Sequence, residues 1–167
     1  AAERALTKAT EKLAIYSEVL GKVEGWGVMI ASRLIASIID IRRFETDAKL
    51  KAFTGVHVLE TGKFPRKRGG EVANWHNDAR QALYLIGDQF NRRPNSRWGK
   101  YQREMKARLR EAHPEVVLGD NGKKRYTDAH ILKMATWRTL TRFVEWLFKE
   151  WWALERARSS QELRKAA

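Results

Sequence analysis

Two glycines separated by one residue, Gly25 and Gly27, interrupt a helical pattern near the start of the chain. Apolar residues recur at helical spacing before them, and a second apolar face restarts at Val28. Glycine adopts positive φ and lets one backbone approach another closely, so the pattern predicts a tight turn between two helices over about residues 13–39. This is the arrangement of a helix-hairpin-helix, in which we expect Trp26 to be buried between the helices.

The glycine turn supports two interpretations. The first backbone amides of the second helix have no partner within that helix, and the helix dipole places partial positive charge there. Such an end binds anions, and on a basic protein the expected anion is a nucleic-acid phosphate. An ordinary corner between two packed helices accounts for the same glycines, so the choice depends on the rest of the chain.

The positive charge of the chain is concentrated in its middle third. The 167 residues include 33 Lys and Arg against 20 Asp and Glu, which gives a net charge of +13. Residues 61–110 alone hold 13 of these cations and 4 of the anions. A generically basic surface is not concentrated in this way, so the excess predicts a polyanionic partner that contacts the middle third. It also favours a phosphate clamp at the glycine turn.

Residues 56–76 lose the helical pattern and contain Pro65 and a Gly-Gly pair. We expect a short extended segment or hairpin that turns at Thr61–Gly62, followed by a basic loop. A flexible cationic loop suits contact with phosphates, although a solvated loop without a ligand has the same composition. The nucleic-acid contacts predicted in this loop are Lys63, Arg66, Lys67 and Arg68.

The remaining sequence predicts a mainly α-helical single domain over residues 1–158, with a frayed tail at 159–167. The helix after Ser96 is basic outside a narrow apolar stripe, which favours packing on another helix over binding a membrane. Near its start, the further predicted nucleic-acid contacts are Arg92, Arg93, Arg97 and Lys100. The predicted helices are 2–20, 28–39, 47–53 (capped by Thr46 and ended by Gly55), 77–92 (capped by Asn77 or Asp78), 97–110 (capped by Ser96) and 127–158 (capped by Thr127 or Asp128), with a loop at 113–124.

The residues that carry most enzyme chemistry are scattered or missing. The chain has no cysteine, which excludes disulfides, thiolate metal sites and a cysteine nucleophile. Its histidines lack metal-ligand spacing, its aspartates lie near turns and helix ends, and no Walker-type loop is present. We therefore expect no metal and no cofactor. No apolar run is long enough to span a bilayer, so we expect a soluble intracellular protein, cytoplasmic or associated with the nucleoid.

Several short motifs follow one another in a recognisable order. They are Gly25-Trp26-Gly27, Ala31-Ser32-Arg33-Leu34-Ile35-Ala36, Asp40-Ile41-Arg42-Arg43-Phe44, Lys49-Leu50-Lys51-Ala52-Phe53-Thr54-Gly55-Val56, the basic loop and the segment Asn77 to Leu85. Over about residues 20–105, this series resembles the C-terminal domain of Piv-like (DEDD) insertion-sequence transposases. The family pattern runs Pro-Gly-Ile-Gly, Ala-x-x-Leu-x-Ala, Gly-Asp-Ile-x-Arg-Phe, Leu-x-Ala-Tyr-x-Gly-Leu, a loop containing Ser-Gly, and a Leu-Arg-x-x-Leu helix.

The resemblance implies a domain that binds nucleic acid through the turn at Gly25, Gly27 and Val28 and through the basic loop. In such enzymes the chemistry is attributed to an RNase H-like domain bearing acidic residues and to a serine of the loop. That domain is absent from this sequence, and Thr61 stands where the family has serine. Thr61 is thus the one catalytic candidate, but a β-branched alcohol is harder to position as a nucleophile, and a role as a turn residue is the favoured alternative. Mg²⁺ is expected only if the chain works within a complete recombinase.

The sequence therefore predicts a DNA-binding domain related to these transposases, not catalytic alone, that contacts mainly phosphates. An active recombinase fragment that cuts and joins DNA is the first alternative. An RNA-binding module is the second, because relatives of the family are thought to use a guide RNA and a basic loop does not distinguish the two polymers. The long terminal helices are expected to allow a homodimer.

Overall fold

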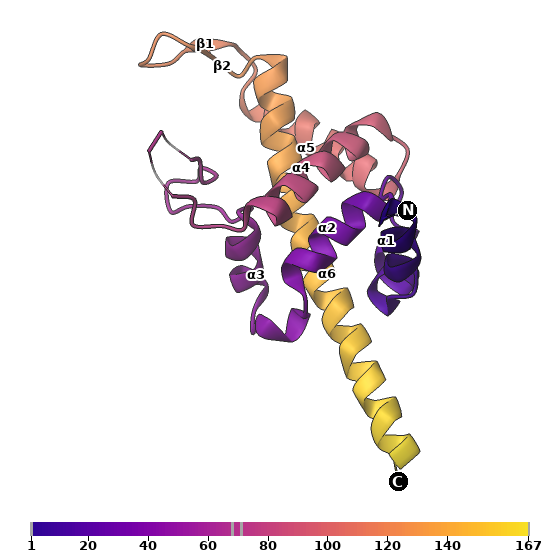
Figure 1. Cartoon of the computed structure of the whole chain (residues 1–167). Helices are drawn as coiled ribbons and strands as arrows, with labels where there is room; N and C mark the ends of the chain where they lie inside the picture. Colours follow the sequence, from indigo (N-terminus) through magenta and orange to yellow (C-terminus); the bar gives the residue numbers. More distant parts are fainter. Residues whose placement is uncertain (1, 68, 71, 167) are drawn as a thin grey trace.

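The fold is mainly α-helical, as predicted, and is organised around one long helix, α6 (Asp128–Ala166). It is known from a computed structural model that describes residues 2–67, 69–70 and 72–166. In Figure 1, α6 crosses the molecule from the β-hairpin to the C-terminus, and its last part extends beyond the other helices. The other elements are α1 (Ala2–Glu11), a π-helical turn (Ile15–Val19), a 3₁₀ turn (Leu20–Lys22), α2 (Val28–Ile38), a second 3₁₀ turn (Ile41–Arg43), α3 (Asp47–Thr54), α4 (Asn77–Arg92), α5 (Arg97–Ala112), β1 (Val117–Leu118) and β2 (Lys124–Arg125).

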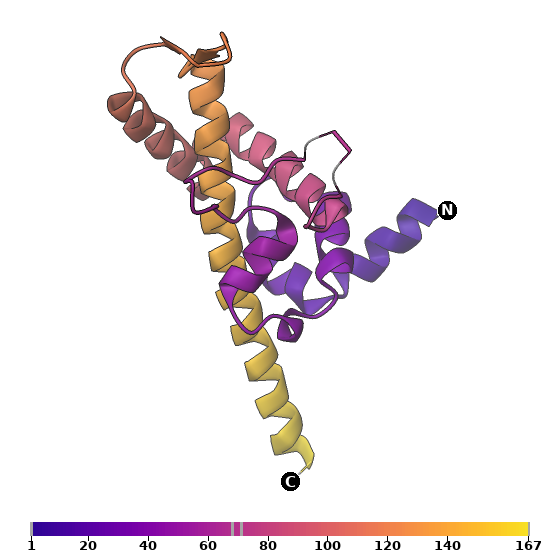
Figure 2. The ribbon, with the colours of Figure 1, turned by 90° about the vertical axis from the view of Figure 1, so that its left-hand side faces the viewer.

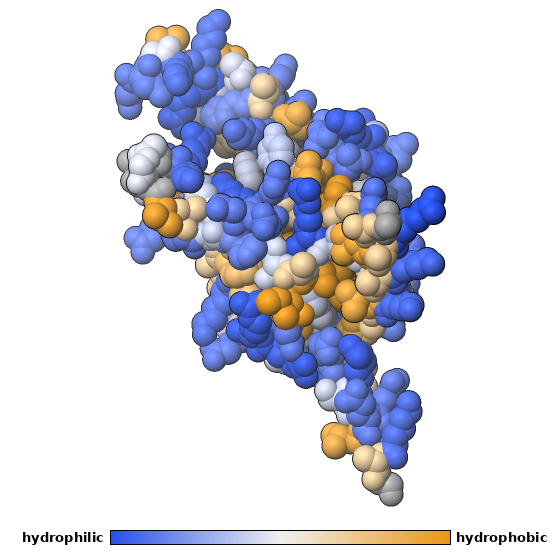
Figure 3. Space-filling model, viewed as in Figure 1, coloured by the Kyte–Doolittle hydropathy of each residue, from blue (hydrophilic) through white to orange (hydrophobic). Residues whose placement is uncertain are grey.

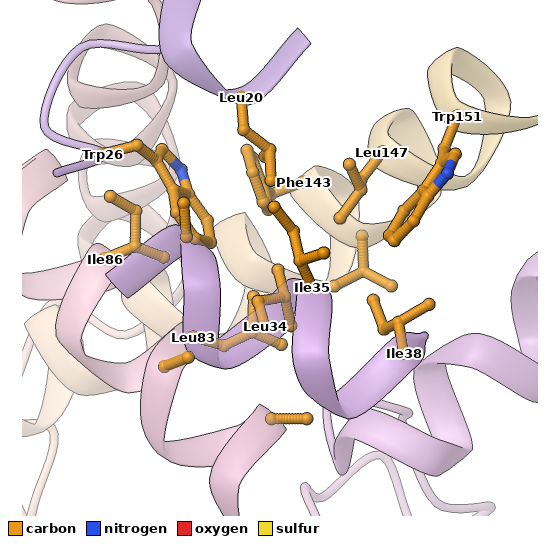
Figure 4. Close-up of a cluster of buried hydrophobic side chains, with 14 of the residues drawn as sticks. Leu20, Trp26, Leu34, Ile35, Ile38, Leu83, Ile86, Phe143, Leu147 and Trp151 are labelled. Carbon is orange, nitrogen blue, oxygen red and sulfur yellow. The ribbon is translucent and has the colours of Figure 1, made fainter. Parts of the chain in front are cut away.

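The core joins one face of α2 to α4 and α6. Apolar side chains of α2 recur at helical spacing and are buried, which places this helix inside the molecule. Figure 4 shows them meeting the buried side chains of α4 and α6. Each fully buried aliphatic or aromatic side chain contributes about 1.5–3 kcal/mol to folding. The side chains at this junction include Leu34, Ile35, Ile38, Leu83, Ile86, Phe143 and Leu147.

Several helix ends agree with the capping residues predicted. The Thr46 and Ser96 hydroxyls accept the amides of Lys49 and Gly99 at the starts of α3 and α5. Gly55 ends α3 in the left-handed conformation, at φ +72°. At the start of α6, Thr127 accepts the amide of His130, which assigns the cap to Thr127 rather than Asp128.

The cap predicted for α4 is wrong. His76, rather than Asn77 or Asp78, occupies the cap position, and its Nδ1 accepts the amide of Ala79 at 3.4 Å. The reason is the backbone, because His76 is extended while Asn77 is already helical.

The N-terminal helix is shorter than predicted. The helix expected over residues 2–20 stops with α1, and Figure 2 shows α1 pointing away from the body of the molecule. Leu6 and Leu13, on its predicted apolar face, are 42% and 43% exposed. The π-helical and 3₁₀ turns that follow change the direction of the chain, and they bring three apolar side chains into the core. These are Ile15, Val19 and Leu20.

The loop predicted at 113–124 contains a small β-hairpin. Val117 pairs with Arg125 and Leu118 with Lys124 in an antiparallel ladder. The turn signal predicted at Gly119–Gly122 closes it, with the Gly122 amide bonded to the Gly119 carbonyl at 2.8 Å. Two-residue strands are too short to leave an alternating pattern in the sequence, which explains why they were not predicted.

The long helix is longer than predicted. The end expected at 158 is wrong, because α6 continues to Ala166 and the segment predicted as a frayed tail is helical over its described residues. Its side chains there are exposed, so packing does not impose the helix. Gln161, Glu162, Leu163, Arg164 and Lys165 favour the helix through their own propensity.

A strained residue ends α2. Ile39 has φ +65° and ψ −62°, and the amide of Asp40 bonds to the carbonyl of Ile38 across it at 2.7 Å. A β-branched residue rarely adopts positive φ. Ile39 is also 71% exposed, so little burial compensates the strain. The transposase pattern that the sequence resembles has glycine at this position.

A partly buried ion pair ties α3 to α6. Lys51 Nζ lies 2.9 Å from Glu145 Oε1 and 3.0 Å from Asp47, and Arg142 donates to the other oxygen of Glu145. Burial alone would raise the pKa of Glu145, but the hydrogen bonds from Lys51 and Arg142 lower it below its ordinary range. The end of α3 that leads into the basic loop is thus fixed to the long helix.

No helix in the described part of the chain is long and apolar enough to cross a membrane.

Candidate nucleic-acid interface

The glycine turn is built against α4. Gly25 has φ +96°, and a Cβ atom there would lie 3.0 Å from the Cβ of Gln89. Both its conformation and its close approach to α4 therefore require glycine. Gly27 differs, since its φ is −74° and nothing lies within 4 Å of the position of a Cβ. The glycine requirement predicted for the pair holds for Gly25 alone.

Trp26 is buried, as predicted, but its principal aromatic partner is in α6. Its ring stacks on Phe143 with 5.5 Å between centroids and 21° between planes. The side chain belongs to the same buried cluster as Leu20 and Ile86 (Figure 4). Trp26 therefore joins the N-terminal segment to the long helix and is not placed to touch a base.

At the start of α2, two backbone amides have no hydrogen-bond partner among the described residues, and a cation lies at the adjoining turn. The Gly27 carbonyl accepts the amides of Ile30 and Ala31, each at 3.1 Å, so the amides of Val28 and Met29 precede the first intrahelical bond. The Arg93 side chain lies against Gly25, 3.6 Å from the position of a Cβ there. A 3₁₀ turn precedes this corner where a helix-hairpin-helix has a regular helix, so that motif stays a prediction.

The basic loop turns where the sequence predicts it. The amide of Gly62 bonds to the carbonyl of Leu59, and the amide of Leu59 bonds to the carbonyl of Lys63, both at 2.8 Å. Gly62 has φ +72°, which favours glycine. No strand flanks this turn in the described part of the loop. Thr61 is exposed beside it.

Arg80 anchors the loop to α4. Its guanidinium lies between the rings of Trp75 and Trp137, 4.1 Å and 4.8 Å from their centroids, and its Nη2 donates to the Pro65 carbonyl at 2.7 Å. Its Nη1 is buried and has no hydrogen-bond partner among the described residues. Burial lowers the pKa of this guanidinium. Packing of Phe64 against Trp137, at 6.1 Å between ring centroids, adds a second attachment.

The cations of the loop point into solvent. Lys63, Arg66 and Lys67 are exposed, while Pro65 between them is buried. Arg68, which is also predicted to contact nucleic acid, lies outside the described residues. The described part of the loop thus combines a tethered backbone with exposed charged side chains.

The other predicted contacts lie around the junction of α4 and α5. Arg92 is 2.9 Å from Asp88, which neutralises part of its charge. Arg97 lies over the rings of Trp98 and Trp146, at 5.1 Å and 5.4 Å from their centroids, with its side chain still exposed. Lys100 is exposed one turn further along α5.

These contacts form two groups at opposite ends of α4. The loop is anchored at Arg80, whereas Arg93 touches the glycine turn. Arg93 follows Arg80 by 13 positions along α4 and its C-cap, which corresponds to about 20 Å along the helix axis. The predicted residues therefore do not form one patch.

The described residues also contain no group of three or more His, Asp or Glu side chains that could hold a metal ion.

Comparison with protein families gives the relationship of the chain. The model of the transposase IS116/IS110/IS902 family matches residues 17–103. The chain belongs to the IS116/IS110/IS902 transposase family. Comparison with curated proteins gave no match, and comparison with solved structures gave none.

The transposase-family region contains both groups of predicted contacts. It runs from the π-helical turn through the glycine turn, α2, α3, the basic loop and α4 into α5. The predicted relation to insertion-sequence transposases is thus confirmed at the level of the family. The β-hairpin and α6 lie outside the matched region.

Proposed function

We propose that this member of the transposase family is a DNA-binding domain, related to the C-terminal part of Piv-like transposases and not catalytic alone. The observation that carries the proposal is the basic loop, where Lys63, Arg66 and Lys67 are exposed on a backbone that Arg80 holds at Pro65. A tethered loop loses less conformational freedom when its cations bind phosphates. Phosphates carry no sequence information, so we expect weak sequence preference and steep salt dependence.

The start of α2 supplies a second contact in this proposal. The free amides of Val28 and Met29 suit a phosphate, and Arg93 beside Gly25 adds positive charge. Arg97 and Lys100 extend the same group along α5. Because backbone amides carry no net charge, we expect them to contribute little to the salt dependence, whereas Arg93, Arg97 and Lys100 should contribute as the loop cations do.

The loop is tested by replacing Lys63, Arg66 and Lys67 together with Ala. Affinity for a short DNA duplex is measured by fluorescence anisotropy at several salt concentrations. Each phosphate contact contributes about 0.9 to the slope of log affinity against log salt, so we expect the slope to become shallower by about 2 to 3. The variant K149A/R164A/K165A, which removes as many exposed cations from α6, is the control. An unchanged slope in the loop variant would remove the loop from the contact surface.

Strand cleavage and joining is a second candidate function, because Thr61 is exposed at a defined turn beside the loop cations. The wild-type chain is incubated with supercoiled DNA and Mg²⁺, and we expect no nicked or joined product. Product that is lost in Thr61→Ala and kept in Thr61→Ser would establish a recombinase instead.

RNA is the alternative polymer, since phosphates are common to both. Competition between duplex DNA and a structured RNA at matched salt distinguishes the two. We expect the DNA duplex to displace labelled DNA at lower concentration than the RNA does.

A further inference from the structure

The β1–β2 hairpin projects from the molecule on the same side as the basic loop. Figure 1 shows both as protrusions on the left of the view, with the hairpin above the loop, and Figure 2 shows both from that side. The hairpin lies outside the region that matches the transposase family. It contributes no side chain to either hydrophobic core cluster apart from Tyr126 at its base. Packing in the core therefore does not explain why the chain forms the projecting hairpin between Val117 and Arg125.

Several contacts tie the base of the hairpin to α5 and α6. Arg110 Nη1 donates to the carbonyls of His113 and Tyr126, at 3.2 Å and 2.9 Å, so one guanidinium holds both ends of the excursion. Its Nη2 pairs with Asp128 at 2.7 Å. The Tyr126 ring stacks on His113, with 3.9 Å between centroids and 4° between planes. Tyr126 also donates its amide to Nδ1 of His130 at 2.9 Å. The hairpin is thus presented in one orientation.

Apolar and cationic side chains stand side by side on the hairpin. Because Val117 pairs with Arg125 and Leu118 with Lys124, each face of the ladder carries one apolar and one basic residue. All four are exposed, Leu118 to 73%, and Lys123 adds a third cation to the returning strand. In Figure 3 the hairpin is mostly hydrophilic, with a few hydrophobic side chains at its exposed surface. The excursion also contains the acids Glu115 and Asp120.

One cation of the hairpin and one of the basic loop both influence the charge of His130, at the start of α6. Burial of His130 lowers its pKa, and the positive charges of Arg125, of Arg66 in the loop and of Lys133 in α6 lower it further. The basic loop, which is distant in the sequence from the hairpin and from the start of α6, therefore contributes positive charge to the same neighbourhood as these two elements. A polyanion that reaches Arg66 in the loop also comes within reach of the hairpin.

We infer that the β1–β2 hairpin is a second nucleic-acid contact, which binds the same duplex as the basic loop. Lys123, Lys124 and Arg125 contact phosphates, while Val117 and Leu118 lie against sugars or base edges in the minor groove. Proteins that bind the minor groove combine basic side chains with apolar wedges in this way. This inference rests on the proposed function, and it adds a contact that the family region does not contain.

The test compares three variants in the same anisotropy experiment. They are the hairpin variant K123A/K124A/R125A, the loop variant K63A/R66A/K67A and the control K149A/R164A/K165A. All of these side chains are exposed, so we expect unchanged thermal unfolding in each. We expect the hairpin variant to weaken binding at least 10-fold relative to the control, with a slope shallower by about 2 if at least two of its cations contact phosphates.

The possible failures are distinguishable. If the loop variant flattens the slope while the hairpin variant matches the control, the inference is wrong and the proposed function stands. If neither variant differs from the control, both are wrong. Loss of binding to anionic phospholipid vesicles in the hairpin variant, without a change in nucleic-acid affinity, would assign the hairpin to a membrane surface and overturn the inference.

The apolar side chains have their own readout. The variant V117S/L118S keeps every charge, so we expect an unchanged salt slope and a several-fold weaker affinity for duplex DNA. Affinity equal to that of the wild type would remove these side chains from the contact and reduce the hairpin to a surface cation cluster, which overturns the groove-binding part of the inference.

Discussion

The glycine turn and the basic loop lie at opposite ends of α4 and are built in opposite ways. In the turn, Trp26 is buried against Phe143 and Gly25 lies against Gln89, so both residues are engaged in packing. In the loop, Pro65 is buried while the cations on either side of it stand in solvent. The same transposase-family region thus contains one element fixed by the core and one whose described cations are exposed to solvent. Of the two glycines that suggest a phosphate clamp, Gly25 is required by packing against α4 and Gly27 is not.

The largest expected effect breaks the packing of the turn. Gly25→Ala forces a side chain into a positive-φ position and against Gln89, so we expect a loss of about 2–3 kcal/mol in the free energy of unfolding. Gly27→Ala is the matched control, with an expected change within about 0.5 kcal/mol, because its φ and its surroundings accept a Cβ. Urea unfolding measures both. Equal effects at the two positions would mean that the turn is not held by α4.

The next effect concerns the anchor of the loop. Arg80→Ala removes two cation–π contacts and the hydrogen bond to Pro65, so we expect a loss of about 2 kcal/mol. Amide hydrogen exchange should accelerate at residues 63–67 and stay unchanged at the glycine turn. Arg80→Lys keeps the charge and loses the stacked plane, and we expect it to be intermediate. Exchange that accelerates equally in both regions would show that Arg80 stabilises the whole domain rather than the loop.

A smaller effect tests the ion pair at the base of the loop. The lowered pKa of Glu145 means that its charged form stabilises the fold above the ordinary value of 4.5, and this contribution is lost as the pH falls through the lower folded value. We expect unfolding free energy to decrease on acidification below pH 4.5, and to decrease less in Glu145→Gln. At neutral pH, Lys51→Met should cost about 1.5 kcal/mol. A variant and wild type with the same acid dependence would exclude Glu145 as its source.

The smallest effect is a gain in stability. Ile39→Gly relieves positive φ at a residue whose side chain is mostly exposed, so we expect about 1 kcal/mol of stabilisation. This is the reverse of Gly25→Ala, where positive φ already has its glycine. The two substitutions separate backbone strain from packing. Ile39 has a positive φ but an exposed side chain, whereas Gly25 has a positive φ and also lies against Gln89. Destabilisation by Ile39→Gly would mean that the exposed side chain makes contacts that its accessibility does not suggest.

Most of the helical framework follows from local sequence, and the exceptions depend on distant residues. The apolar spacing of α4 and α5 and the caps at Thr46 and Ser96 need only neighbours along the chain. The π-helical turn forms because Ile15 and Leu20 reach a core built from other helices. His76 is the cap because its backbone is extended. The sequence does not indicate this, because the adjacent Asn77 and Asp78 are more common capping residues.

The candidate site shows the same division. The turn at Thr61–Gly62 and the exposed cations of the loop could be predicted from composition. The anchoring role of Arg80 could not be predicted, because in the sequence Arg80 is one of many cations on a helix. The role depends on Trp137, which lies in a helix far along the sequence. The role of Arg110 could not be predicted for the same reason. Arg110 bonds to both ends of the β-hairpin, and these ends come together only in the folded structure.

The stacking of Arg80 between Trp75 and Trp137 also gives the domain an optical reporter. Indole emission responds to the polarity and charge around the ring, and both rings lie where the loop meets the body of the protein. Trp26 and Trp151 are buried in the core and supply a constant background, whereas Trp98 and Trp146 lie under Arg97 and respond to a ligand at that end of α4. A ligand that moves the loop therefore changes the emission of the unlabelled chain, so engagement of the loop can be followed in real time without modifying the protein.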